Sequence, residues 1–437
     1  MLNTIRNAWR IPDLRKKMLF TLFIIIAFRF GSVIPIPFLD MNSLQALMES
    51  ASANTALGYI NMLTGGAFQY ASLFAMGITP YINSSIIMQL LTIAIPALER
   101  LQKEGEEGRK KIATITRFVT VGLGLIQGVA YYIYLRSSGI VKYTAGAGGV
   151  FVGFVIVLAF TAGTALIMWM GEQINEKGIG NGISMILFAG IVARLPVTFG
   201  SVWQYFKLGL DSPSTAGHFL VLAPLFIVLF LVVIWVIVFM NEAERRIPVQ
   251  YAKKVVGRKM YGGQSTFLPI KVAMSGVMPV IFASAILSIP QFVQFFAHPA
   301  EGTFWASVLN AFQQTGWVYI ILYFLLIVMF AYFYMSVQYN PLEMANNLRQ
   351  SNGTIPGLRP GKPTADFIAK ILSKVTLIGA LFLAFVALIP IIFTNITGMG
   401  GLSLGGTSVI IIVGVALETV KQLESQMMMR HYKGFLD

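Results

Sequence analysis

The stretch NMLTGGAFQYASLFAMGITPYINSSIIMQLL, residues 61–91, predicts a membrane segment that is broken in its middle. Its first part, residues 61–76, would give a helix of only about 24 Å, which is too short to cross a bilayer. Gly77 then interrupts the apolar run, Thr79 can cap a new helix, and Pro80 suits the first turn of that helix. We therefore expect a helix that begins inside the bilayer.

A helix that begins at this depth predicts a cavity beside it, because non-helical backbone is tolerated there only when it is buried in protein or lines a water-filled path. The side chains available to line this cavity are aliphatic. Ile78 and Ile82 are spaced to share one helical face, and Ile183 and Leu187 repeat that spacing in a later run. Ordinary helix packing, including a proline-kinked helix, is the alternative explanation of both patterns.

The composition is typical of a polytopic helical membrane protein. Hydrophobic residues make up 56% of the 437 residues and charged residues only 11%, and apolar runs of about 20 residues recur along the chain. The absence of cysteine excludes disulfides and thiol chemistry, and the basic N-terminus lacks a small-residue cleavage site, so no removable signal peptide is expected. Ten spans are predicted, at residues 18–36, 61–97, 112–135, 149–171, 182–200, 217–240, 272–296, 316–339, 371–394 and 405–422.

The distribution of the 32 basic residues predicts the orientation of these spans. The two termini and every second loop hold 26 of them, whereas the other loops hold only Arg136, Lys142, Arg194 and Lys207. By the positive-inside rule, both termini are expected on the cytoplasmic side.

An internal repeat predicts how the spans are grouped. GITPYI at 77–82 resembles GVMPVI at 276–281, and five spans separate the two motifs. An odd offset makes the two copies run in opposite directions, as in inverted-topology repeats. We expect two five-helix halves, residues 1–205 and 206–437, that face each other like a clamshell, although a match of six residues can also arise by chance.

The ionisable residues inside the predicted spans argue against ion coupling. Arg29, Arg117 and Glu418 all lie towards span ends, so no carboxylate or histidine lies at the bilayer midplane to bind a coupling ion. Motifs for intramembrane proteolysis are absent, and GIGNGIS at 178–184 lacks the Lys-Ser/Thr of a phosphate loop. A passive conduit is favoured, with a secondary transporter of a small solute as the alternative, and we expect no catalytic residue, metal site or cofactor.

Two predicted cytoplasmic loops, residues 241–271 and 340–370, are long and basic. They interleave Lys and Arg with Gly, Pro and Tyr, a composition typical of ordered loops that bind partners or phosphate backbones. Contact with anionic lipid headgroups is the alternative.

Seven stretches carry a family resemblance: residues 61–91, KEGEEGRKKI (103–112), GEQINEKGIGNGIS (171–184), ERRIPVQYAKK (244–254), QSTFLPIKVAMSGVMPVIFASA (264–285), NPLEMANNL (340–348) and GLRPGKPT (357–364). Together they resemble the bacterial SecY family, the central subunits of the protein-conducting channel, over nearly the whole chain. The resemblance implies an all-α fold of ten transmembrane helices in two inverted halves around an hourglass pore in the bacterial cytoplasmic membrane. The partners that it implies are SecE, SecG, the SecA ATPase, a translating ribosome, and substrates with signal sequences, besides anionic lipids.

The matching motifs imply four groups of functional residues. The pore ring is Ile78, Ile82, Ile183, Leu187, Ile281 and Ile411, and Leu187 stands where many relatives have isoleucine. The plug, expected as a short helix over about residues 61–74, includes Asn61, Gly65, Gly66, Phe68 and Phe74. The lateral gate, between spans 2 and 3 and spans 7 and 8, includes Ile87, Gln89, Gln127, Ala283 and Ser284, whose polar members are expected to hold the seam closed. The partner-binding residues are Arg245, Arg246, Lys253, Lys254, Arg258, Lys259, Arg359 and Lys362.

Overall fold

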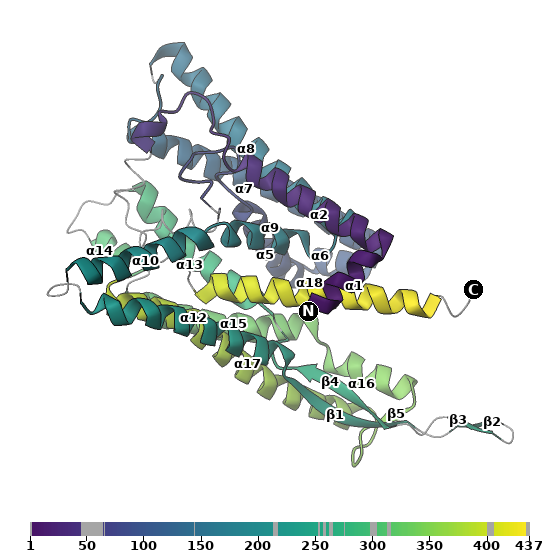
Figure 1. Cartoon of the computed structure of the whole chain (residues 1–437). Helices are drawn as coiled ribbons and strands as arrows, with labels where there is room; N and C mark the ends of the chain where they lie inside the picture. The colour runs from purple at the N-terminus through teal and green to yellow at the C-terminus, as the bar shows by residue number, and fades with distance from the viewer. Residues whose placement is uncertain are drawn as a thin grey trace.

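The computed structural model of the chain is mostly helical (Figure 1). It describes residues 2–44, 64, 66–143, 145–212, 217–251, 254–256, 259–261, 265–274, 276–297, 304–312, 316–399 and 406–433. The helices are α1 (Leu2–Arg10), α2 (Pro12–Gly31), α5 (Thr79–Ala94), α6 (Pro96–Lys103), α7 (Glu106–Ser137), α8 (Gly146–Lys177), α9 (Gly182–Val192), α10 (Leu195–Asp211), α12 (Phe219–Glu242), α13 (Met278–Ala297), α14 (Phe304–Ala311), α15 (Trp317–Gln338), α16 (Pro341–Gln350), α17 (Lys362–Thr397) and α18 (Gly406–Lys433). The strands are β1 (Glu244–Tyr251), β2 (Lys254–Val256), β3 (Lys259–Tyr261), β4 (Ser265–Lys271) and β5 (Gly353–Thr354).

Each of the ten predicted spans overlaps at least one of these helices, which confirms the polytopic helical class. Within the described residues, seven helical segments are long and apolar enough to cross a membrane, or eight if the bent pair α5 and α6 counts as one span. α2 carries charged residues in its first turns, and α13 is a shorter apolar helix only as far as Pro290. These two helices coincide with the first and seventh predicted spans.

The broken span begins its helix where the sequence predicts. α5 starts at Thr79 with Pro80 in its first turn, but Ile78 is the N-cap residue and makes no side-chain cap, so the prediction that Thr79 caps the helix is wrong. α5 also ends before residue 97. The residue before Pro96 has an extended backbone, as residues before proline prefer, and the chain bends there by 100° into α6.

The two repeat motifs share one local structure. Gly77 has a φ of +58° and Gly276 a φ of +57°, and each lies two residues before the first residue of a helix. A left-handed backbone of this kind suits glycine, because it has no Cβ. Pro80 and Pro279 each occupy the second position of the helix that follows. The two six-residue motifs are therefore similar in structure as well as in sequence: each forms a turn at the glycine followed by the start of a helix.

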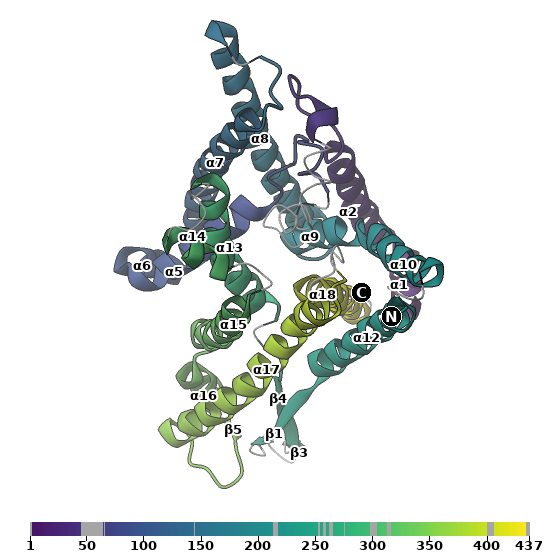
Figure 2. The same cartoon turned by 90° about the vertical axis from the view of Figure 1, so that its left-hand side faces the viewer.

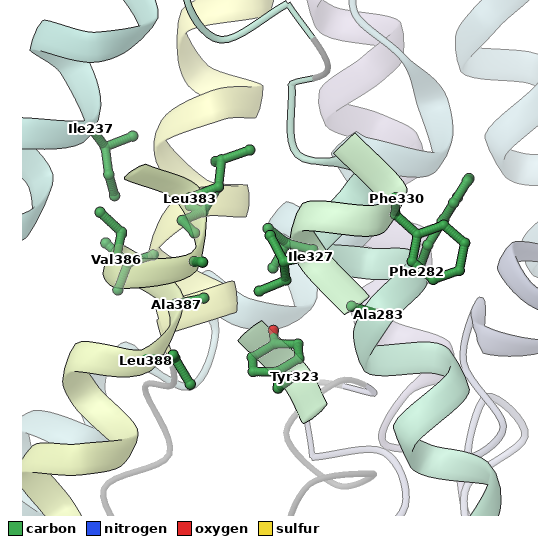
Figure 3. Close-up of a cluster of buried hydrophobic side chains, with 14 of the residues drawn as sticks. Ile237, Phe282, Ala283, Tyr323, Ile327, Phe330, Leu383, Val386, Ala387 and Leu388 are labelled. Atoms are coloured by element: carbon green, nitrogen blue, oxygen red, sulfur yellow. The ribbon is translucent and has the colours of Figure 1, made fainter. Parts of the chain in front are cut away.

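The helices form two groups with separate cores. In Figures 1 and 2, α2, α7 and α8 lie on one side, α12, α15 and α17 on the other, and α9 and α18 between them. The N-terminal group shares a core around Tyr131, Leu135 and Phe160. The C-terminal group shares a core in which α17 side chains meet those of α12, α13 and α15, including Tyr323 and Leu383 (Figure 3). α10 runs past residue 205, so the division of the chain at 205/206 stays a prediction.

All five described strands lie in the two long basic loops. β1 pairs antiparallel with β4 along its length and with β5 at its end. Ile247 and Ile270 of this sheet bury their side chains in a cluster with Ala345 of α16 and Ile368 of α17. β2 and β3 form a separate hairpin that projects beyond the sheet (Figure 1).

Candidate pore, plug and gate

The six predicted ring residues are brought together by four separate parts of the chain. Ile78 and Ile82 come from the start of α5, Ile183 and Leu187 from α9, Ile281 from α13, and Ile411 from α18. All six belong to one apolar cluster. Ile78, Leu187 and Ile411 are buried in it, and the other three are partly buried against it. The structure therefore contains an aliphatic junction between the N-terminal group, α18 and α13.

The start of α9 shows how the sequence positions ring residues. Asn181 is the N-cap, and its Oδ1 accepts hydrogen bonds from the amides of Ile183 at 3.1 Å and Ser184 at 3.3 Å. The Oδ1 of Asn175 accepts from the amide of Gly182 at 2.7 Å. All three bonds satisfy amides that the first turn of a helix leaves without intrahelical partners. The GIGNGIS run is thus a capped helix start that holds Ile183 at the junction.

In the part that the structure describes, the plug stretch is a run of turns and not the expected helix. In its described part, residues 64 and 66–74, the amide of Ala71 donates to the carbonyl of Phe68 at 3.0 Å and the amide of Ser72 to that of Ala67 at 3.2 Å. Gly66 and Ala71 have positive φ values of 91° and 38°, which a right-handed helix does not accommodate.

Three of the predicted plug residues have a described position. Gly66, Phe68 and Phe74 are buried. Asn61 and Gly65 lie outside the described residues.

One face of α5 forms a seam with the C-terminal group. Ile82, Ile86 and Leu90, spaced four residues apart, all contact the core that contains Ala283 of α13. Ile86 is only 5% exposed, whereas the predicted gate residue Ile87 is 39% exposed. We call this contact the front seam, and Ile86 rather than Ile87 is its buried member.

Among the described residues, the polar residues expected at the gate make no hydrogen bond across the front seam. The hydroxyl of Ser284 donates to the carbonyl of Ile281 in its own helix at 2.8 Å. Gln89 on α5 and Gln127 on α7 are partly buried. The hydroxyl of Ser84 joins α5 to the carbonyl of Thr116 in α7, within the N-terminal group. Among the described residues, no hydrogen bond joins α5 to α13.

The predicted partner-binding residues lie on the projecting sheet and loops. Arg245 and Arg246 are exposed on β1, where the Nε of Arg246 donates to Glu244 at 2.6 Å. Arg359 and Lys362 are exposed at the turn that leads into α17. Lys253 and Arg258 lie outside the described residues, and Lys254 and Lys259 belong to β2 and β3, for which only the backbone is described.

A contact between the two ends of the chain was not predicted. The Oγ1 of Thr4 donates to Glu424 at 3.0 Å, the Nζ of Lys17 to Gln426 at 3.4 Å, and the amide of Gly180 to the Oε1 of Gln422 at 2.9 Å. An apolar cluster lies beside these bonds, formed by Ala8, Leu14, Ile179 and Leu423. We call this contact the clasp. The spacing of apolar residues in α1 could have indicated an amphipathic helix, but not that α18 is its partner.

Two arginines predicted inside spans have definite surroundings. The Nε of Arg117 on α7 donates to Glu172 on α8 at 2.7 Å, which forms a salt bridge between the two helices. Arg29 is partly buried in the last turn of α2. Neither residue belongs to the apolar junction of the ring residues.

An aliphatic junction, a buried plug stretch and a seam between two helical groups define the class of protein-conducting channels. The SecY family model matches residues 72–420. The protein translocase subunits SecY of Streptomyces coelicolor and Mycobacterium bovis are 44% and 41% identical to this chain over the full length of both chains. The chain belongs to the SecY family.

Solved structures show the same fold. The structure described as "The structure of a protein conducting channel" has a TM-score of 0.63 at 17% identity and covers 94% of this chain and 92% of its own. Sec61 in a canine ribosome–channel complex has a TM-score of 0.59 at 15% identity, with the same coverage. The function is that of a channel subunit for protein translocation, and the alternative of a small-solute transporter is not favoured.

Proposed function

We propose that the six aliphatic residues form the seal through which unfolded polypeptides pass, and that the chain catalyses no reaction. The observation that carries this proposal is their junction in one apolar cluster, although they come from distant parts of the chain. A pore for chains of any sequence cannot rely on specific polar contacts, and a ring of branched aliphatic side chains excludes water while it deforms around a passenger.

The plug and the front seam complete this proposal. The plug stretch, residues 61–74, closes the outer side of the pore while the channel is idle. The front seam parts when halves 1–205 and 206–437 move apart, so that an apolar segment leaves sideways into lipid. The protein lies in the bacterial cytoplasmic membrane with both termini in the cytoplasm, which the distribution of basic residues supports.

The seal is tested by two substitutions on the same helix. Ile281→Ser places a hydroxyl in the ring, whereas Ile289→Ser changes an exposed residue of α13. A polar ring residue favours a wet pore, so we expect the first variant to raise ion conductance in planar bilayers and the second to leave it unchanged. Equal conductance of the two variants would mean that Ile281 only packs helices together.

The drive for translocation comes from partners at the basic loops. We place the docking of the SecA ATPase and of a translating ribosome at the turn around Arg359, whose carbonyl accepts a hydrogen bond from the Oγ1 of Thr364 at 2.8 Å. This bond supports an ordered tip that presents an exposed guanidinium, which can bind a carboxylate or phosphate with two hydrogen bonds. SecE and SecG accompany the chain in the membrane, and anionic lipids contact the remaining basic residues.

Charge reversal at this tip is expected to impair the docking of the partner that drives export without changing the pore itself. We expect Arg359→Glu to abolish SecA-driven export into inverted vesicles, Arg359→Lys to be intermediate, and SecE content and thermal stability to stay normal. Arg349→Glu, at an exposed position of the neighbouring α16, is the matched control and should leave export intact. Normal export by Arg359→Glu would assign this tip to lipid contact and move the docking site to the other basic loop, at Lys253, Lys254, Arg258 and Lys259.

A further inference from the structure

The plug stretch lies in a seat built by the N-terminal group. The ring of Phe68 stacks on the ring of Tyr131 of α7, with centroids 4.3 Å apart and an angle of 24° between the ring planes. The hydroxyl of Tyr131 donates to the backbone carbonyl of Phe68 at 3.0 Å. Tyr131 is 2% exposed and is supported from behind by Phe160 of α8, at a centroid distance of 5.1 Å. One side chain therefore holds both the ring and the backbone of the same plug residue.

Two glycines leave room for the other end of the plug. A methyl group on Gly31 of α2 would overlap the ring of Phe74, which stacks on Phe28 at 5.8 Å. A methyl group on Gly163 of α8 would overlap the backbone carbonyl of Leu73. The surfaces of α2 and α8 are therefore shaped to the plug by the absence of side chains.

Backbone hydrogen bonds fix the plug against the segment that follows α2. The amide of Ile36 donates to the carbonyl of Ala71 at 3.2 Å, and the amide of Leu73 donates to the carbonyl of Ile34 at 3.0 Å. These bonds hold Ala71 at a φ of +38°, a conformation that residues with a Cβ rarely adopt. All of these seat contacts come from residues before Lys177, the end of α8.

We propose that Tyr131 is the positioning residue that sets how readily the plug leaves its seat, and thereby how strictly the channel requires a signal sequence. This inference rests on the proposed sealing role of the plug. Departure of the plug breaks the stack and the hydrogen bond together, because both involve Phe68. When the plug leaves, the Phe68 carbonyl keeps the hydrogen bond that it accepts from the amide of Ala71, because both residues belong to the plug. It loses only the hydrogen bond that it accepts from the hydroxyl of Tyr131.

The experiment removes only the hydroxyl. The chain has no cysteine, so Ala67→Cys introduces a single thiol at a position that is 1% exposed while the plug is seated. In this background, we expect Tyr131→Phe to raise the rate of labelling by a membrane-impermeant maleimide about fivefold, as loss of one hydrogen bond implies. The same variant should export a substrate with a defective signal sequence.

Tyr132→Phe is the matched control, because it removes the neighbouring hydroxyl, which lies against Gly153 of α8, and leaves the hydrogen bond from Tyr131 to Phe68 in place. We expect it to change neither labelling nor export. Equal labelling of the Tyr131→Phe and Tyr132→Phe proteins would overturn the role of Tyr131. Faster labelling without export of the defective substrate would keep Tyr131 as the seat residue and overturn the sealing role of the plug.

A second pair of variants tests the seat without changing Tyr131. Gly163→Ala pushes against the Leu73 carbonyl, whereas Gly148→Ala adds a methyl group on the same helix where no atom lies nearby. We expect the first variant to label faster than the parent and the second to label at the parental rate. Identical rates for the two variants would contradict the seat, with thermal unfolding of each protein confirming that it is folded.

Discussion

Two of the contacts between the N-terminal helices and the C-terminal part of the chain, the front seam and the clasp, differ in chemistry. At the front seam, Ile82, Ile86 and Leu90 of α5 meet an apolar core, and no hydrogen bond joins α5 to α13 among the described residues. At the clasp, α18 receives hydrogen bonds from Thr4, Lys17 and the backbone of the loop before α9, beside a small apolar cluster.

The difference indicates which contact opens. Inside a bilayer, lipid chains are as apolar as leucine, so lipid can replace an apolar partner helix at little cost. Opening the front seam therefore leaves no polar group without a partner. Opening the clasp would break the hydrogen bond of the partly buried Gly180 amide, and a typical hydrogen bond contributes about 0.5–1.5 kcal/mol to stability. We infer that the front seam moves and that the clasp is the pivot.

Covalent locking gives the largest expected effect. Cysteines at Ile86 and Ala283, in a chain that otherwise has none, should close the front seam when they are joined by a disulfide or a short bismaleimide. Because the proposed function requires the two halves to part, we expect translocation of a preprotein into vesicles to stop, and to return when a disulfide is reduced.

The same lock at the clasp is the control. Cysteines at Thr4 and Glu424 replace an existing contact of 3.0 Å, so joining them should leave translocation unchanged if the clasp is a pivot. Full translocation with a cross-linked front seam would show that the front seam does not need to open. Loss of translocation with a cross-linked clasp would show that the clasp is not the pivot.

A smaller effect is expected from a substitution that shortens one buried side chain of the front seam. Ile86→Ala should let a weak-signal substrate cross about tenfold faster, which corresponds to about 1.4 kcal/mol. This is less than the cost of about 2–5 kcal/mol in a soluble core, because lipid chains fill part of the space. The measurement is the export rate of that substrate.

Ile87→Ala is the matched control for this prediction, because it changes the neighbouring exposed side chain. We expect its export rate to equal that of the parent chain. If Ile87→Ala accelerated export as much as Ile86→Ala, the originally predicted gate residue would be the correct one.

The sequence predicted those parts of the site whose backbone conformation depends mainly on neighbouring residues. The start of α5 follows from Gly77 and Pro80, since both residues restrict the backbone around them. Helical spacing indicated only Ile78, Ile82, Ile183 and Leu187 as cavity-lining residues, and the family resemblance added Ile281 and Ile411. The structure brings all six into one cluster. The repeat of GITPYI in GVMPVI likewise predicted two helix starts with the same geometry.

Features decided by distant contacts could not be predicted in this way. The turns of the plug depend on bonds from the segment that follows α2, which hold Ala71 in a left-handed conformation. The choice between Ile86 and Ile87 depends on how α5 is rotated against α13, and both residues fit the same apolar run. In the clasp, Thr4 contacts Glu424, which lies more than 400 positions later in the chain. No local sequence pattern in α1 indicates that Glu424 is the partner of Thr4.

The smallest effect is expected at the clasp itself. Gln422→Ala removes the acceptor of the Gly180 amide and should lower the free energy of unfolding by about 1 kcal/mol, whereas Gln422→Glu keeps an acceptor and should lower it less. Neither variant should change the export rate of the weak-signal substrate, because a pivot holds in both the closed and the open channel. Thermal unfolding in detergent measures the stability of each variant, and export into vesicles measures the translocation rate. If Gln422→Ala accelerated export as Ile86→Ala is expected to do, the clasp would also open during translocation, and the pivot would have to lie elsewhere along α10 and α12.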